Sequence, residues 1–161
     1  MTIKTIYSLI EFISNKLISI EDFSYGTNLE FNESNTKTYP LLYLEFPIMI
    51  ERPSEREEIF SFSLNLIDKI DEKDPTLSRI NIVSKMHQVS LEVESIIKTE
   101  LKPLNAKFTV VNSITLLDEW ADNVSGVQME CRISHNNSVR PCEINTELGS
   151  FIDLLNRNSC N

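Results

Sequence analysis

Side chains that could bind a metal or carry out acid–base chemistry are densest in a short acidic run. Asp68, Asp71, Glu72 and Asp74 offer oxygen ligands of the kind that Ca²⁺ binds. The run lacks the glycine and the distal glutamate of an EF-hand loop. Asp74 also precedes Pro75, a pair typical of a helix N-cap followed by proline at the first helical position. We therefore interpret the run as a solvated turn and helix cap.

Histidine and cysteine are the other potential metal ligands. His87, Cys131 and Cys142 could meet in space, but their spacing does not resemble a zinc motif, and an ordinary, partly buried His87 is the default interpretation. The chain has 3 cysteines, with no CxxC pair. An odd number of this kind favours reduced thiols in a cytosolic setting. We expect no metal and no cofactor.

Signatures of catalysis are missing from the sequence. No Ser or Cys lies in a nucleophile elbow, and there is no GxGxxG or P-loop. The chain has only 3 glycines, which argues against glycine-rich phosphate loops. No two carboxylates stand out as an acid and base pair. We predict no catalytic residues and a protein that is not an enzyme.

Composition limits the possible partners. A chain of 161 residues fits a single domain with a sizeable core. Its net charge of -9 argues against binding nucleic acid by neutralising phosphates. No window reaches the roughly 18 apolar residues of a membrane span, and no signal peptide is recognisable. We expect no membrane contact.

The elements that must position any site begin with a helix over residues 3–20, whose isoleucines recur at steps of three and four. Leu29 and Phe31 suggest a short strand. Residues 41–50 and 59–67 alternate apolar and polar side chains, which predicts a long antiparallel ribbon. Pro47 cannot donate to a sheet ladder, so the first ribbon strand is expected to be an edge or to bulge there.

The second half of the chain predicts a long helix over residues 76–101, two more strands, and a short amphipathic segment near residues 146–156. Together these elements predict an α+β fold. About five strands would form a mostly antiparallel sheet, with two long helices packed on one face, in the order α-β-β-β-α-β-β-α. Residues 1–156 would form the single domain, and residues 157–161 a flexible C-terminal tail.

Two charged segments are the candidate interaction sites. The ribbon tip carries both signs of charge and is either a solvated turn or an arm that meets opposite charges on a neighbouring subunit. The loop around Trp120 holds an aromatic side chain among carboxylates, so Trp120 is either an interface anchor or a cap over the core. The candidate subunit-interface or lumen residues are Glu51, Arg52, Glu55, Arg56, Glu57, Glu58, Asp118, Glu119, Trp120 and Asp122.

The order of elements, a long ribbon followed by a long helix, resembles the tail-terminator or tail-completion proteins of tailed bacteriophages. The segments YPLLYLEFP, FSFSLNLIDKID and DEWADNVSGVQMECRIS are similar to the corresponding parts of such proteins. They are close in character to connector and neck components of phages that infect Bacteroidetes bacteria, such as the crAss-like group. The resemblance covers most of the chain at the level of pattern, and it brings no catalytic residues.

The resemblance implies a virion protein of the tail or neck that is present in the host cytoplasm during assembly. Copies of the chain would form a ring of six or twelve, joining the tail tube to the portal-side connector. DNA would pass through the lumen without specific binding, because acidic residues there would repel it. The alternative is a small bacterial α+β adaptor that binds a peptide or protein at a sheet edge without catalysis.

Overall fold

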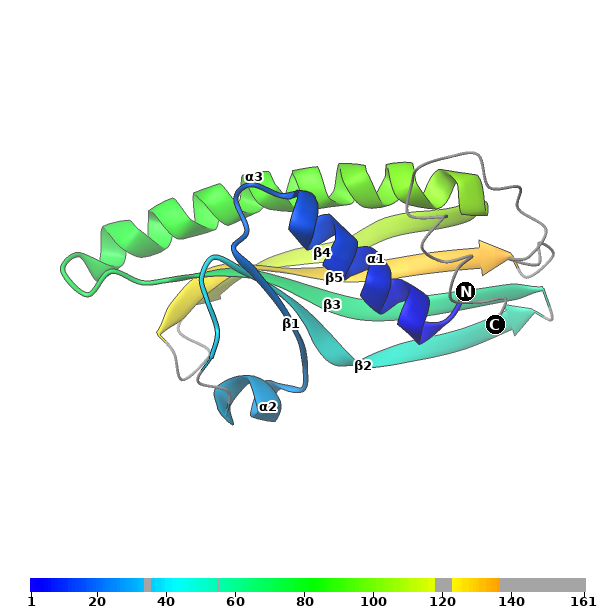
Figure 1. The fold of residues 1–161 in the computed structure, drawn as a ribbon, viewed down its shortest axis with the longest axis horizontal. Helices are drawn as coiled ribbons and strands as arrows, with labels where there is room; N and C mark the ends of the chain where they lie inside the picture. The colour runs from blue at the N-terminus through cyan, green and yellow to red at the C-terminus, as the bar shows by residue number, and fades with distance from the viewer. Residues whose placement is uncertain (34–35, 55, 118–122, 137–161) are drawn as a thin grey trace.

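The protein folds as a five-stranded sheet with helices on both faces (Figure 1). The computed structural model describes residues 1–33, 36–54, 56–117 and 123–136. The predicted amphipathic segment near 146–156 and the tail 157–161 lie outside these residues. The elements are α1 (Ile3–Lys16), β1 (Asp22–Gly26), α2 (Asn28–Glu33), β2 (Leu41–Ser54), β3 (Glu57–Lys69), α3 (Pro75–Leu101), a 3₁₀ turn (Lys102–Leu104), β4 (Ala106–Leu117) and β5 (Val124–Asn136).

The sheet confirms the predicted α+β class and places the strands in the order β1-β2-β3-β5-β4. Every neighbouring pair is antiparallel except β1 and β2, which run parallel. The sheet is therefore mixed. β3 is its middle strand, with β2 on one side and β5 on the other, and β5, which comes last in the described chain, lies between β3 and β4. No described helix has the length and hydropathy needed to cross a membrane.

The main core lies between one face of the sheet and the two long helices. Alternate residues of β3, from Phe60 to Leu66, point into it as the sequence predicts, and Leu64 is completely buried. Side chains of α1, α3, β2, β4 and β5 also belong to the cluster. Burying each large side chain of this kind contributes about 1.5–3 kcal/mol. This apolar layer fixes the helices against the sheet.

Both long helices begin at side-chain caps. In α1 the Thr2 hydroxyl accepts a hydrogen bond from the Thr5 amide at 3.2 Å. In α3 the Asp74 carboxylate accepts one from the Leu77 amide at 3.1 Å, which confirms the predicted cap. The first helix ends at Lys16 and not at residue 20 as predicted. Leu17 and Ile20 follow the helix but are still buried in the core, so the apolar spacing continues past the last helical residue.

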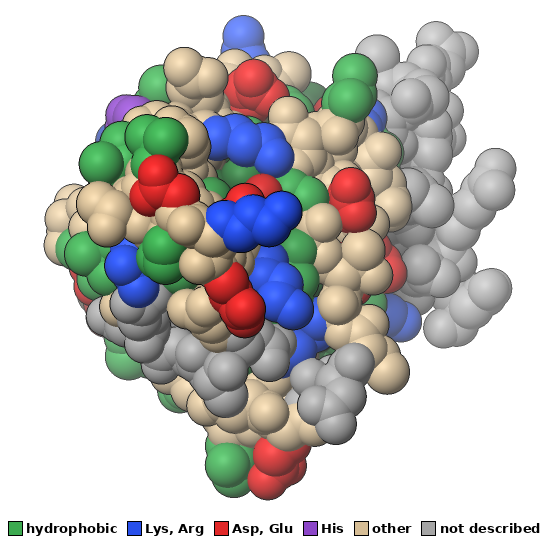
Figure 2. Space-filling model, turned by 90° about the vertical axis from the view of Figure 1, so that its left-hand side faces the viewer, with side chains coloured by type: hydrophobic (Ala, Val, Ile, Leu, Met, Phe, Trp, Pro, Cys, Tyr) green, Lys and Arg blue, Asp and Glu red, His purple; other side chains and the backbone are tan. Residues whose placement is uncertain are grey.

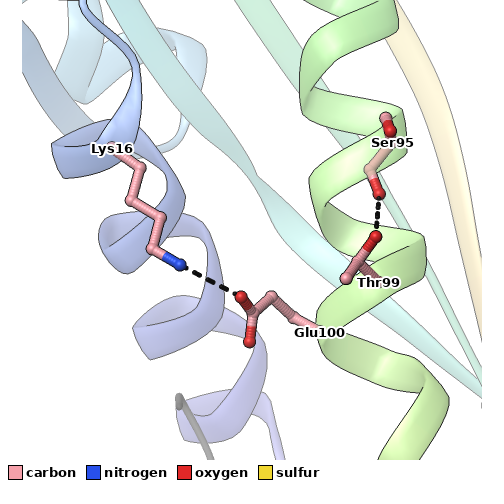
Figure 3. Close-up of polar contacts among 4 residues, drawn as sticks. All are labelled: Lys16, Ser95, Thr99 and Glu100. Atoms are coloured by element: carbon pink, nitrogen blue, oxygen red, sulfur yellow. Dashed lines mark hydrogen bonds and ion pairs between the residues drawn. The ribbon is translucent and has the colours of Figure 1, made fainter. Parts of the chain in front are cut away.

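The end of α1 is tied to the end of α3 by an ion pair (Figure 3). Lys16 Nζ lies 3.1 Å from Glu100 Oε1 and also stands 4.1 Å from the centre of the Phe12 ring. Directly before Glu100 on α3, the Thr99 hydroxyl donates to the Ser95 carbonyl at 2.9 Å. Half-exposed pairs of this kind contribute less than about 1 kcal/mol, so apolar packing dominates this contact.

α2 packs on one part of the opposite face of the sheet (Figure 1). The sequence wrongly predicted a strand here, through Leu29 and Phe31. The Thr27 amide and hydroxyl donate to the Glu30 carboxylate at 2.7 and 3.0 Å, and the Glu30 amide donates to the Thr27 hydroxyl at 3.3 Å. This reciprocal capping starts a helix that the alternating pattern hides. Phe31 then packs edge-on against Tyr43 in a second, smaller core.

The ribbon is longer than predicted, and its tip is shorter. β2 continues to Ser54 and β3 begins at Glu57, so most of the segment predicted as a tip over residues 51–58 is strand. The pairing register shifts between Glu45 and Met49, around Pro47, which confirms the predicted bulge. Strand structure persists past the bulge because β3 supplies a partner, while charged side chains and Pro53 are tolerated at an edge.

Candidate interaction surfaces

The ribbon tip predicted from the sequence is mostly exposed, with one exception. Glu51, Arg56 and Glu57 are exposed. Glu58 is buried, and its Oε1 lies 2.8 Å from Arg52 Nη2, whose side chain is largely exposed. Arg52 neutralises the Glu58 carboxylate within the same chain, so Glu58 stabilises the fold of the single copy. Glu55 lies outside the described residues.

The second predicted segment, Asp118, Glu119, Trp120 and Asp122, also lies outside the residues that the structure describes. Whether Trp120 anchors an interface or caps the core stays a prediction. β4 ends at Leu117 and pairs with β5, which starts at Val124.

The outer edge of β4 is a surface that the sequence reasoning missed. β4 is 12 residues long and lies at the end of the sheet, and no described strand pairs with its outer side. Residues 108–117 contain no charge, no proline and no glycine. Val111, Ile114 and Leu117 are 57%, 41% and 55% exposed. Natural edge strands are usually protected by charges, proline or bulges. Apart from a register shift between Val110 and Asn112, residues 108–117 carry none of these, so this edge is open to pairing with another strand.

A groove of about 530 Å³ runs between the first half of β4 and the C-terminal part of α3. Ala106, Phe108 and Val110 line its floor, and Lys98, Lys102 and Lys107 line its sides together with Glu94. Lys98 Nζ lies 2.6 Å from the Glu94 carboxylate, so one lysine is neutralised locally. Lys102 and Lys107 are exposed. The groove therefore combines an open strand edge with positive charge on an otherwise acidic protein.

A second open edge belongs to β2. β1 pairs only with residues 41–45 of β2, ending at Gly26 opposite Glu45. Residues 46–54 therefore have β3 on one side and no described strand on the other. Met49 and Ile50 are 60% and 48% exposed there. The sheet thus has an open edge at each side, on different strands.

The face of the sheet away from the long helices is open beyond the smaller core. A hollow of about 360 Å³ is lined by Met49, Glu51, Val111, Glu130 and Arg132 among others. At its inner end the Glu45 carboxylate accepts hydrogen bonds from the side-chain amides of Asn65 at 3.1 Å and Gln128 at 2.9 Å. These bonds join three strands.

Tyr43 belongs to the smaller core and holds α2 in place. Its hydroxyl donates to the Thr27 carbonyl at 2.8 Å. Burial, reinforced by the nearby carboxylates of Glu30 and Glu45, raises the pKa of Tyr43 to about 12. Tyr43 is therefore a neutral hydrogen-bond donor at physiological pH, and its role in the described structure is to position α2.

Among the described residues, the side chains that could do metal or redox chemistry do not converge. His87 is exposed on α3 and not partly buried as predicted, whereas Cys131 is buried in the main core. Burial raises the pKa of the Cys131 thiol well above its usual range, so it is protonated at neutral pH. Within the described ranges, no group of three His, Cys, Asp or Glu side chains could hold a metal ion. Cys142 lies outside those ranges.

The described side chains at the end of the molecule where α3 begins carry charges of both signs (Figure 2). Lys and Arg side chains gather near the centre of that face, with Asp, Glu and hydrophobic side chains beside them. Mixed charge of this kind is typical of a solvated surface, which leaves the strand edges as the better candidates for binding.

Comparison with known proteins adds no identification, because no protein-family model and no curated protein matches this chain.

Proposed function

We propose that the protein is a structural subunit that assembles into a ring in the neck or tail of a tailed bacteriophage, as a tail terminator or head–tail connector. The observation that carries the proposal is that the sheet has two open edges on opposite sides, β4 and residues 46–54 of β2. A head-to-tail contact needs two different surfaces on each copy, and rotation then closes such contacts into a ring.

The place in a phage particle rests on the resemblance of the ribbon and long helix to tail-terminator proteins. The net charge of -9 suits a ring through which DNA passes, because acidic walls repel phosphates. We propose that the ring joins the tail tube to the portal-side connector and has no catalytic role. In this proposal the exposed tip residues Glu51, Arg56 and Glu57 lie at subunit or lumen surfaces.

The test is the mass of the purified chain in solution. Each copy has a mass of 18.5 kDa, so light scattering after size exclusion should give a discrete multiple, with six or twelve copies expected. Negative-stain images of the same fraction should show rings with a central hole. A chain that stays monomeric at high concentration and adds no ring to tail particles would argue strongly against the proposal.

The groove between α3 and β4 favours a second candidate, an adaptor that adds an extended peptide to the β4 edge. This candidate requires a monomer or dimer with the groove open. Peptide binding by a monomer, measured by calorimetry with an extended acidic peptide, would favour the adaptor over the ring subunit.

A further inference from the structure

We infer that residues 48–54 of β2 in one copy add as an antiparallel strand to the outer edge of β4 in the next copy, along the groove between β4 and α3. This inference rests on the proposed ring assembly and specifies its subunit contact. It concerns two strand edges that no other described strand of the same copy pairs with.

Strand direction is the first support. β2 is antiparallel to β3, β3 to β5, and β5 to β4, so β4 runs opposite to β2. Copies related by rotation about an axis along the strands keep the direction of every strand. The β2 strand of one copy is then antiparallel to the β4 strand of its neighbour. Antiparallel pairing continues the pattern of the sheet and needs no reversal of either copy.

The position of the two edges along the strand direction is the second support. Glu51 pairs with Ile59, Ile59 with Ser134, and Ser134 with Lys107, so Glu51 and Lys107 lie in one row across the sheet. β1 covers only the other half of β2, at residues 41–45. The free half of β2 therefore lies level with the first half of β4, where the groove is. Pairing is confined to these halves, because β1 of the next copy lies level with the part of β4 that follows its register shift between Val110 and Asn112.

Side-chain chemistry is the third support. Continuing the row without a shift places Glu51 of one copy opposite Lys107 of the next, on the same face of the joined sheet. The next row places the half-exposed Ile50 beside Phe108, at the apolar floor of the groove. Copies that each carry a net charge of -9 repel one another, so a lysine-lined groove is the favourable place for contact.

Charge reversal tests the contact directly. Lys107→Glu and Glu51→Lys should each raise the concentration at which half of the chains assemble by about tenfold, because each replaces attraction with repulsion. The double variant restores an opposite pair at every contact and should assemble as the wild type does. Matched controls are Lys73→Glu and Glu72→Lys, both exposed in the turn before α3 at the other end of the sheet, which should leave assembly unchanged.

Cross-linking tests the register. Met49 and Thr109 occupy the next row on the same face, so Met49→Cys with Thr109→Cys should give a ladder of disulfide-linked copies on oxidation. Cys142 and Cys160 are replaced by serine in this background, and either cysteine alone should give no ladder.

The outcomes separate this inference from the proposed function. A wild-type chain that never assembles overturns both. A wild-type chain that assembles normally, with neither charge reversal affecting it and no ladder forming, overturns the β2–β4 contact and leaves the ring intact. Loss of assembly in each single variant, rescue in the double variant, and a ladder together support the contact. Far-ultraviolet circular dichroism of every variant checks that the fold is retained.

Discussion

Replacing Gly126 by alanine should separate the two central strands of the sheet. Gly126 lies in β5 opposite Ile67 of β3. A Cβ at this position would stand 1.9 Å from the Leu66 carbonyl oxygen and 2.9 Å from the Ile67 Cα. An ordinary carbon–oxygen contact between strands is about 3.3 Å, so the backbone would have to move by more than about 1 Å. Both of the crowding atoms are backbone, so no rotamer change relieves the overlap.

The expected cost follows from what this movement disrupts. Overpacking a filled site costs about 1–3 kcal/mol, and the ladder hydrogen bonds beside it contribute about 1 kcal/mol each. Together we expect a loss of about 3–5 kcal/mol, a large part of the roughly 5–15 kcal/mol that stabilises a typical domain.

Urea unfolding followed by circular dichroism measures this loss. With a slope of about 2 kcal/mol per molar, the midpoint of Gly126→Ala should fall by about 2 M. Glu130→Ala, at an exposed position of the same strand, is the matched control and should change stability by no more than about 0.5 kcal/mol. A Gly126→Ala midpoint equal to that of the wild type would refute the close pairing of β3 and β5 at this position.

Three further predictions concern single side chains. Leu64→Ala should lower the free energy of unfolding by about 2–5 kcal/mol because Leu64 is fully buried, while Leu91→Ala, at a position 55% exposed, should stay within about 0.5 kcal/mol; urea unfolding of both checks this contrast. Hydrogen bonds from Thr27 lower the pKa of Glu30 in the folded chain, so the stabilisation of α2 by the Glu30 carboxylate is present above the unfolded pKa and is lost as pH falls through the folded pKa. Hydrogen exchange of the α2 amides should become faster over this pH range, and Glu30→Gln should abolish the pH dependence of that exchange. With the other cysteines replaced by serine, Cys131 should resist a thiol reagent in the folded chain and react after unfolding; rapid native labelling, seen by mass spectrometry, would contradict its burial.

The sequence was most informative where a local pattern, such as alternation or a helix cap, matched the side chains that the fold buries. Alternation in β3 and the Asp74–Pro75 start of α3 predicted the central strand and the long helix correctly. It failed around Phe31, where alternation suggested a strand but the Thr27–Glu30 capping bonds start a helix. The parallel strand β1 was missed because five residues with mixed polarity carry little periodic signal.

The candidate site was harder to predict than the fold. Glu51 was chosen from its charge in the tip, but Lys107 was not chosen, because the row that joins them passes through β3 and β5. Strands that pair across long stretches of sequence leave no local sign of their register. The open β4 edge did leave a sign, the uncharged run over residues 108–117. A search for edge strands without charge or proline would have found it.

The position of β5 between β3 and β4 affects how the chain is made. β3 ends at Lys69, but the strand that covers its second side begins only at Val124. At a synthesis rate of about 5–20 residues per second, β5 is synthesised on the order of several seconds after β3. During this interval an apolar strand has an unsatisfied edge on the ribosome, where it can pair with a neighbouring nascent chain. Slow passage through residues 70–123 should therefore increase aggregation during expression, and low temperature or a holding chaperone should improve the yield of folded protein.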